Sequence, residues 1–99
     1  MPYRIEYSPD AEQHLRILTT QQRAAVFDAV DRQLAHQPGT ETRNRKPMRP
    51  NPLAPWELRI GNIRVYYDVG EKPLPTVYIL AVGVKEHNLV RIGKEVIKL

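Results

Sequence analysis

Trp-Glu-Leu-Arg-Ile-Gly-Asn-Ile-Arg-Val-Tyr-Tyr, residues 56–67, contains two runs in which polar and apolar side chains alternate. Such alternation is typical of strands, and Gly61-Asn62 stands between the two runs. Glycine at the first central position of a two-residue loop favours a type II′ turn, whose twist matches that of the flanking strands. The stretch therefore predicts a β-hairpin with Ile60 opposite Ile63 and Trp56 opposite Tyr67.

This register gives the hairpin one wholly apolar face and one polar face. The polar face carries Glu57, Arg59, Arg64 and Tyr66. Arg59 lies directly opposite Arg64, and like charges at facing positions repel each other. A bound anion such as an RNA phosphate, or an acidic partner, would relieve the repulsion. Two interpretations of Tyr66 stay open, because its ring could stack on a base or pack beside Arg64.

The rest of the chain predicts further strands and two helices. Residues 2–7 alternate as in a half-buried strand, and residues 76–84 form an apolar, β-branched run typical of a central strand buried on both faces. Helices are expected over about 9–18 and 21–36, with Ser8 and Thr20 as N-caps. Gly93 within residues 89–99 favours a short strand or hairpin there rather than a helix.

These elements predict an α+β fold. A helix hairpin at about 9–36 should cover one face of a twisted, mostly antiparallel sheet with four strands or slightly more, at 2–7, 55–60, 63–69 and 76–84. The residues expected in the core between the two layers are Leu15, Leu18, Phe27, Val30, Leu34, Trp56, Leu58, Ile60, Ile63 and Val65.

Composition limits the possible functions. Ninety-nine residues suit one domain, residues 1–99, and 41% apolar with 26% charged residues is typical of a soluble globular protein. There is no cysteine, which excludes disulfides and thiolate metal sites. No metal-ligand cluster or glycine-rich phosphate loop is evident, so we expect no cofactor. We also expect no signal peptide, no membrane span and a cytoplasmic location.

Basic residues are concentrated in the later part of the chain. Residues 1–38 hold four basic and five acidic residues, whereas residues 39–68 hold six and three. Residues 38–55 contain five prolines and no periodicity, which predicts a long loop. Within it Arg43, Arg45, Lys46 and Arg49 form a basic cluster without an acid. That cluster is either a solvated basic loop or a phosphate-contacting one beside the arginines of the hairpin.

The three histidines are scattered. His14 and His36 lie on the expected helices and are predicted to be surface residues. His87 follows the central strand, close to Lys85. It is either an ordinary loop histidine or a general acid or base that works near neutral pH.

Two segments carry a resemblance to a known family. Leu-Arg-Ile-Gly-Asn-Ile-Arg-Val-Tyr-Tyr at 58–67 and Ile-Leu-Ala-Val-Gly-Val-Lys-Glu at 79–86, in a chain with this order of elements, resemble the RelE/ParE superfamily of type II toxin–antitoxin toxins. The similarity extends over essentially the whole length. Arg-Ile-Gly-Lys-Glu at 91–95 resembles a RelE-like subgroup whose chains end in a strand.

The resemblance implies a toxin neutralised by an acidic antitoxin that wraps around it. RelE-type members cut mRNA in the ribosomal A site by activating the ribose 2′-hydroxyl to attack the adjacent phosphate. By position, Arg59 matches the hairpin arginine that contacts this phosphate, and Lys46 or Arg49 matches the loop cations. Lys85 stands where an arginine is usual. Arg91 stands where RelE-type toxins carry a catalytic tyrosine, and His87 is the nearby substitute.

We therefore expect a ribosome-dependent mRNA endonuclease that needs no metal, with Arg59, Lys85 and His87 as catalytic residues in one concave site. The residues expected to bind RNA are Arg43, Arg45, Lys46, Arg49, Arg64, Tyr66 and Arg91. Two alternatives stay open: a ParE-like inhibitor of DNA gyrase that cuts no RNA, and a degenerate toxin that only binds its antitoxin.

Overall fold

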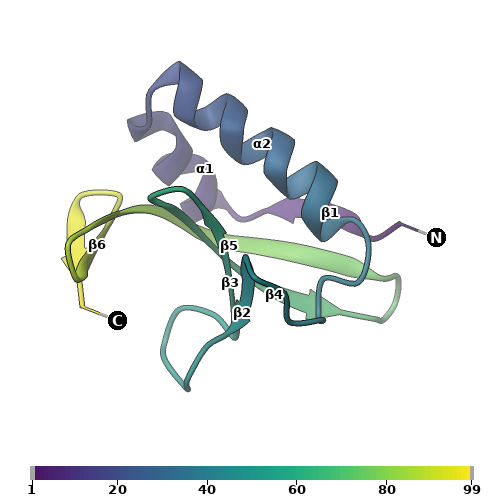
Figure 1. Cartoon of the computed structure of the whole chain (residues 1–99). Helices are drawn as coiled ribbons and strands as arrows, with labels where there is room; N and C mark the ends of the chain where they lie inside the picture. Colours follow the sequence, from purple (N-terminus) through teal and green to yellow (C-terminus); the bar gives the residue numbers. More distant parts are fainter. Residues whose placement is uncertain (1, 99) are drawn as a thin grey trace.

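The computed structural model describes residues 2–98 and confirms the α+β prediction. Within this range two helices lie on one face of a twisted, mostly antiparallel sheet (Figure 1). Met1 and Leu99, the two end positions of the domain predicted over 1–99, lie outside the described residues. The elements are β1 (Arg4–Tyr7), α1 (Pro9–Ile17), α2 (Thr20–Leu34), β2 (Arg45–Pro47), β3 (Trp56–Ile60), β4 (Ile63–Gly70), β5 (Thr76–Glu86), β6 (Leu89–Ile92) and β7 (Glu95–Ile97).

The hairpin of β3 and β4 has the register predicted from the sequence. Ile60 pairs with Ile63, Arg59 with Arg64 and Trp56 with Tyr67. Gly61 has a φ of 58°, whereas Asn62 does not have a positive φ. This combination fits a type II′ turn, in which only the first central residue takes the left-handed conformation that glycine adopts without strain.

The long strand β5 organises the sheet, whose order is β2-β3-β4-β5-β6-β7. β4 pairs with one edge of β5, and its other edge is shared by two strands. β1 runs parallel to residues 76–79, and β6 runs antiparallel to residues 83–86. Most of β5 is buried on both faces, as predicted. The predicted hairpin at the end of the chain is also confirmed, since β6 and β7 pair around a turn in which Gly93 has a φ of 62°.

The two helices begin with side-chain caps. The Ser8 side chain accepts a hydrogen bond from the Ala11 amide, as expected. The second cap is Thr19 rather than the predicted Thr20. Its side chain accepts from the Gln22 amide while the Gln22 side chain accepts from the Thr19 amide. This reciprocal capping box is possible only one residue earlier than expected.

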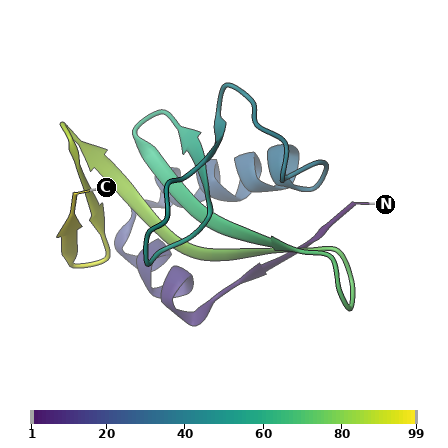
Figure 2. The same cartoon turned by 90° about the horizontal axis from the view of Figure 1, so that it is seen from below.

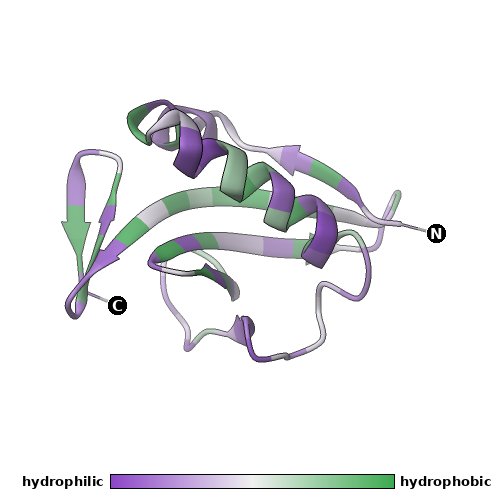
Figure 3. Ribbon diagram, turned by 45° about the horizontal axis from the view of Figure 1, so that its top comes forward, coloured by the Kyte–Doolittle hydropathy of each residue, from purple (hydrophilic) through white to green (hydrophobic). Residues whose placement is uncertain are grey.

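The main core lies between the helices and the sheet, where apolar residues of both layers meet (Figure 3). It includes Leu15, Val30 and Leu34 from the helices and Leu58 and Val65 from the hairpin, as predicted. The prediction that Phe27 lies in the core is wrong. It is 43% exposed and packs edge-to-face on Tyr7, with ring centroids 5.5 Å apart. The buried stripe of α2 runs through Val26, Ala29, Val30 and Leu34, and Phe27 lies beside it.

A second apolar cluster covers part of the opposite sheet face. The loop 48–55 and the β6–β7 hairpin fold over that face, which Figure 2 shows from below. The buried members of the cluster are Ala54, Tyr66, Ala81, Val90 and Ile92, with Met48, Leu53, Leu80 and Ile97 packed against them. The polar face of the hairpin is therefore open only in part.

Among residues 2–98, no helix is both long enough and apolar enough to cross a membrane.

Candidate functional site

Three of the predicted cations surround one hollow on the polar face of the sheet. The hollow has a volume of about 190 Å³ and is lined by Glu57, Arg59, Arg64, Lys85, Asn88 and Val90; we call it the arginine hollow. The strand register explains the arrangement. Arg59 pairs with Arg64, Arg64 pairs with Gly83, and side chains two residues apart share a face, which brings Lys85 to the same side.

The charges in the arginine hollow are partly balanced within the chain. The Arg59 Nε donates to Glu57 Oε1 at 2.8 Å, and the Arg64 Nη1 donates to the carbonyl oxygens of Gly61 and Ile63 at 2.7 and 3.0 Å. The expectation that an external anion relieves the repulsion between the arginines is thus incomplete, because Glu57 already supplies a negative charge. Within residues 2–98, the two Nη atoms of Arg59 make no hydrogen bond.

A larger groove continues from the arginine hollow along the proline-rich loop. This proline groove, of about 630 Å³, shares Glu57 and Arg59 with the hollow. Its other lining residues are Lys46, Pro47, Met48, Arg49, Pro50, Asn51, Pro52, Leu53, Ile97 and Lys98. The groove combines apolar walls with the side chains of three further cations, Lys46, Arg49 and Lys98.

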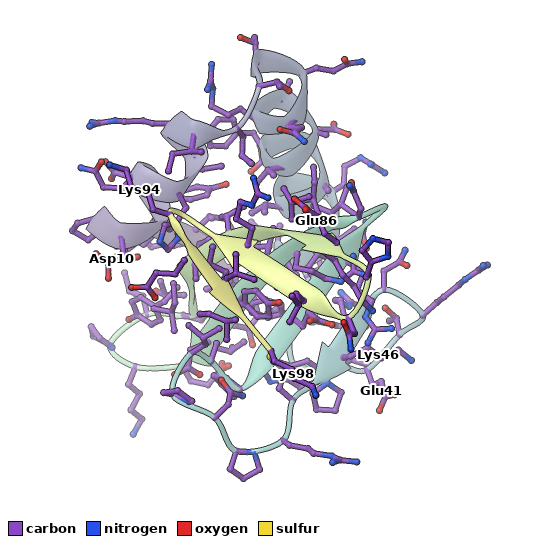
Figure 4. The ribbon with its side chains drawn as sticks, turned by 90° about the vertical axis from the view of Figure 1, so that its left-hand side faces the viewer. Asp10, Glu41, Lys46, Glu86, Lys94 and Lys98 are labelled. Atoms are coloured by element: carbon purple, nitrogen blue, oxygen red, sulfur yellow. The ribbon has the colours of Figure 1, made fainter. Side chains whose placement is uncertain are left out.

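The elements that carry these cations are ordered by specific contacts. Lys46 pairs across the strands with Glu57, and its Nζ lies 3.4 Å from Glu41 Oε2. In the loop, Asn51 Oδ1 accepts from the amides of Leu53 and Ala54, while Asn51 Nδ2 donates to the carbonyls of Arg49 and Ala54. In Figure 4 the β6–β7 hairpin brings Lys98 beside Lys46 at one end and Lys94 beside Asp10 at the other.

Two cations of the basic loop do not reach the site. The Arg45 Nη1 donates to the carbonyl oxygens of Gln33 and His36 at 2.6 and 3.1 Å. It therefore satisfies free carbonyls at the end of α2 instead of facing solvent. Arg45 faces the helices because it pairs with Leu58, whose side chain is in the main core. Arg43 is exposed ahead of β2 and lines neither the hollow nor the groove.

The segment from Lys85 to Arg91 is divided between the two faces of the sheet. Arg91 pairs across the strands with Val84 and forms an ion pair of 3.0 Å with Glu86, on the helix side. The prediction that Arg91 joins the cations of the hairpin is wrong, because strand alternation sends it to the other face. His87 is exposed in the β5–β6 turn with a φ of 58°, and its neighbour Asn88 lines the hollow instead.

Tyr66 is fully buried beneath the second apolar cluster. Of the two interpretations left open, stacking on a base is ruled out by this burial, and packing within the protein is what the structure has. Burial raises the pKa of the Tyr66 hydroxyl, and the nearby Glu57 charge adds to the effect. Among the described residues this hydroxyl has no hydrogen-bond partner.

The comparisons with known proteins point to one family. No family model matches the sequence, and no curated protein does. A chain in the crystal structure of the toxin–antitoxin complex RelBE2 from Mycobacterium tuberculosis is similar to this one. The TM-score is 0.72 and the sequence identity 27%, over 86% of this chain and 100% of that chain. The chain is a RelE-like toxin.

Four residues of interest in this RelE-like toxin were not predicted. Glu57 and Asn88 line the arginine hollow, and Lys98 reaches the proline groove. Strand alternation in the sequence already placed Glu57 beside Arg59, whereas Lys98 depends on how the β6–β7 hairpin folds back. His14, expected on the surface, is half-buried against β5, where its Nδ1 accepts a hydrogen bond from the Val82 amide at 3.2 Å.

Proposed function

We propose that this RelE-like toxin cuts mRNA on the ribosome and belongs to a type II toxin–antitoxin module. The observation that carries the proposal is the convergence of Arg59, Arg64 and Lys85 around the arginine hollow. Three cations on neighbouring β-strands can bind one RNA phosphate. The cations along the adjoining proline groove can bind the flanking phosphates of single-stranded RNA.

The chemistry of RNA cleavage needs such a cluster. Attack of a ribose 2′-hydroxyl on the adjacent phosphate passes through a pentavalent state with additional negative charge. Preformed hydrogen-bond donors aimed at this charge lower the barrier because they need no reorganisation during the reaction. In this mechanism the free Nη atoms of Arg59 and the Lys85 ammonium stabilise the additional negative charge, and Arg64 binds the same phosphate.

The proposed protein partner is an acidic antitoxin. The similar chain from M. tuberculosis was solved within a toxin–antitoxin complex. The proline groove, with its apolar walls and cationic side chains, is complementary to an acidic segment that also carries apolar residues. An antitoxin bound there would cover Arg59 and so block the proposed RNA site.

The test is primer extension on an mRNA that is translated in the presence of the purified toxin. Lys85→Ala should lower the cleavage rate by about a hundredfold, the scale observed when one preorganised donor is removed. Lys85 is exposed and no ion pair holds it among residues 2–98, so the melting temperature should not change. Lys94→Ala removes an equally exposed cation far from the hollow and should cleave like the wild type.

One observation favours a second candidate, the gyrase inhibitor. The resemblance implies that Arg91 stands where RelE-type toxins carry a catalytic tyrosine, and among residues 2–98 neither a tyrosine nor a histidine lines the arginine hollow. A supercoiling assay with DNA gyrase separates the two candidates. Inhibition of gyrase without any mRNA cleavage would refute the endonuclease proposal.

A further inference from the structure

Glu57 is the acidic residue lining the arginine hollow and the proline groove among residues 2–98. Its side chain is only 12% exposed. A carboxylate at this position weakens the attraction of the surface for RNA, because it reduces the positive charge that the phosphates would meet. A surface that served only to bind RNA would be better without it, which raises the question of its chemical role.

Arg59 connects Glu57 to the proposed phosphate site. The guanidinium uses its Nε on Glu57 Oε1, at 2.8 Å, and leaves both Nη atoms unbonded among the described residues. A planar guanidinium can bind a different oxyanion on each edge. A phosphate bound through the Nη atoms would therefore lie next to the Glu57 carboxylate, with the ribose hydroxyl of the preceding nucleotide beside it.

The surroundings hold the carboxylate in one place. Lys46 of β2 and Tyr66 of β4 are its cross-strand neighbours, and the second apolar cluster covers Tyr66. The charged or titratable groups that face Glu57 are Lys46, Arg59, Arg64, Tyr66, Lys85 and Lys98. Arg59 fixes the orientation of the carboxylate by a charge-assisted hydrogen bond.

We propose that Glu57 is the general base that removes the proton from the attacking ribose 2′-hydroxyl. This inference rests on the proposed endonuclease function. As the proton moves to the carboxylate, the 2′-oxygen forms a bond to phosphorus and the bond from phosphorus to the 5′-oxygen breaks. The electron pair of that bond stays on the leaving oxygen, which takes a proton from the Lys85 ammonium. The products are a 2′,3′-cyclic phosphate and a 5′-hydroxyl end.

The experiment compares Glu57→Gln with the wild type in single-turnover cleavage of mRNA on programmed ribosomes. Glutamine keeps the size of the side chain and an oxygen for Arg59 but is not a base. The rate should fall by about a hundredfold or more, the usual contribution of a general base. Glu86→Gln is the matched control, because it removes the charge from another Glu–Arg pair on the other sheet face, and it should cleave like the wild type.

Two further measurements separate catalysis from a structural role. Binding to ribosomes carrying an mRNA with a 2′-deoxy nucleotide at the cleavage site should be as tight for Glu57→Gln as for the wild type, or tighter. Glu57→Asp keeps a carboxylate and should cleave faster than Glu57→Gln. The inference is overturned if Glu57→Gln cleaves within threefold of the wild type, or if its loss of cleavage is matched by a loss of binding.

Cleavage by the wild type shows whether a negative result concerns only the role of Glu57 or the endonuclease function as a whole. If the wild type cleaves and Glu57→Gln cleaves equally well, only the role of Glu57 is wrong. If the wild type does not cleave at all, the endonuclease function is wrong and the role of Glu57 is overturned with it.

Discussion

His14 closes a gap in the sheet, and this contact should make stability depend on pH. The edge of β5 that pairs with β1 at residues 76–79 and with β6 at 83–86 has no strand partner between these segments among residues 2–98. Helix α1 supplies the missing contacts. The Ser8 hydroxyl donates to the Leu80 carbonyl at 3.2 Å, and the Val82 amide donates to His14 Nδ1 at 3.2 Å.

Acid should weaken this contact because Nδ1 accepts a hydrogen bond only when it carries no proton. Burial lowers the pKa of His14 in the folded chain, although Asp10 and Glu95 oppose the shift. In the unfolded chain the pKa returns to its ordinary value of about 6.5. The unfolded state therefore binds the proton more readily. The contribution is fully present above pH 6.5 and is lost as the pH falls through the lower, folded-state pKa.

The size of the effect follows from the bond that is lost. A hydrogen bond of this kind contributes about 1 kcal/mol net, which corresponds to about 4–8 °C in melting temperature for a chain of this length. The measurement is thermal unfolding followed by circular dichroism between pH 8 and pH 5 at constant ionic strength. Most carboxylates remain ionised in this interval, so their titration adds little.

Two variants test the assignment to His14. His14→Asn places an amide oxygen near the position of Nδ1 and cannot be protonated in this range, so it should remove the pH dependence. His36→Asn changes an exposed histidine and should keep it. A wild-type melting temperature that is equal at pH 8 and pH 5, or an undiminished pH dependence in His14→Asn, would refute the reasoning.

Three further variants test how buried positions contribute to stability, each measured by urea denaturation. Leu58→Ala empties a fully buried position and should cost about 2–5 kcal/mol, whereas the exposed Val96→Ala should cost almost nothing. Gly83→Ala should cost about 1–3 kcal/mol, because a Cβ there would lie 2.6 Å from the Arg91 carbonyl oxygen; a neutral effect would contradict this close approach. Tyr66→Phe removes a buried hydroxyl that has no hydrogen-bond partner among residues 2–98, and it should leave stability unchanged or raise it; a clear loss of stability would contradict this expectation.

The features that could be predicted from the sequence depend on local rules. Gly61-Asn62 fixes the turn, the turn fixes the register of β3 and β4, and the period of two then assigns each side chain to a face. This reasoning placed Arg59 opposite Arg64 correctly. The start of α1 at Ser8-Pro9 was predicted for a similar reason, because a cap depends only on residues within one turn.

The wrong predictions concern residues whose surroundings are formed by segments far apart in the sequence. Alternation assigns Tyr66 to the polar face, but only the packing of loop 48–55 and the β6–β7 hairpin shows that this part of the face is covered. Arg45 was included among the RNA-binding cations because it belongs to a basic run. Its actual contacts are with carbonyls at the end of α2, which the sequence does not indicate. Arg91 lies on the opposite sheet face from the one predicted, because the length of β5 and its turn set the register of β6.

The arrangement of the two sheet faces bears on how variants of the arginine hollow should be interpreted. The two arginines of the hollow each have a core residue as immediate neighbour, Leu58 beside Arg59 and Val65 beside Arg64. Core packing therefore holds the backbone positions of these arginines, and a substitution in the hollow changes charge without emptying the core. Arg59 is the exception to this separation. Removing it leaves the mostly buried Glu57 without its ion pair, so Arg59→Ala combines a loss of stability with any loss of activity. Lys85 and Glu57 can be altered without this effect, and their variants are the ones that report on chemistry.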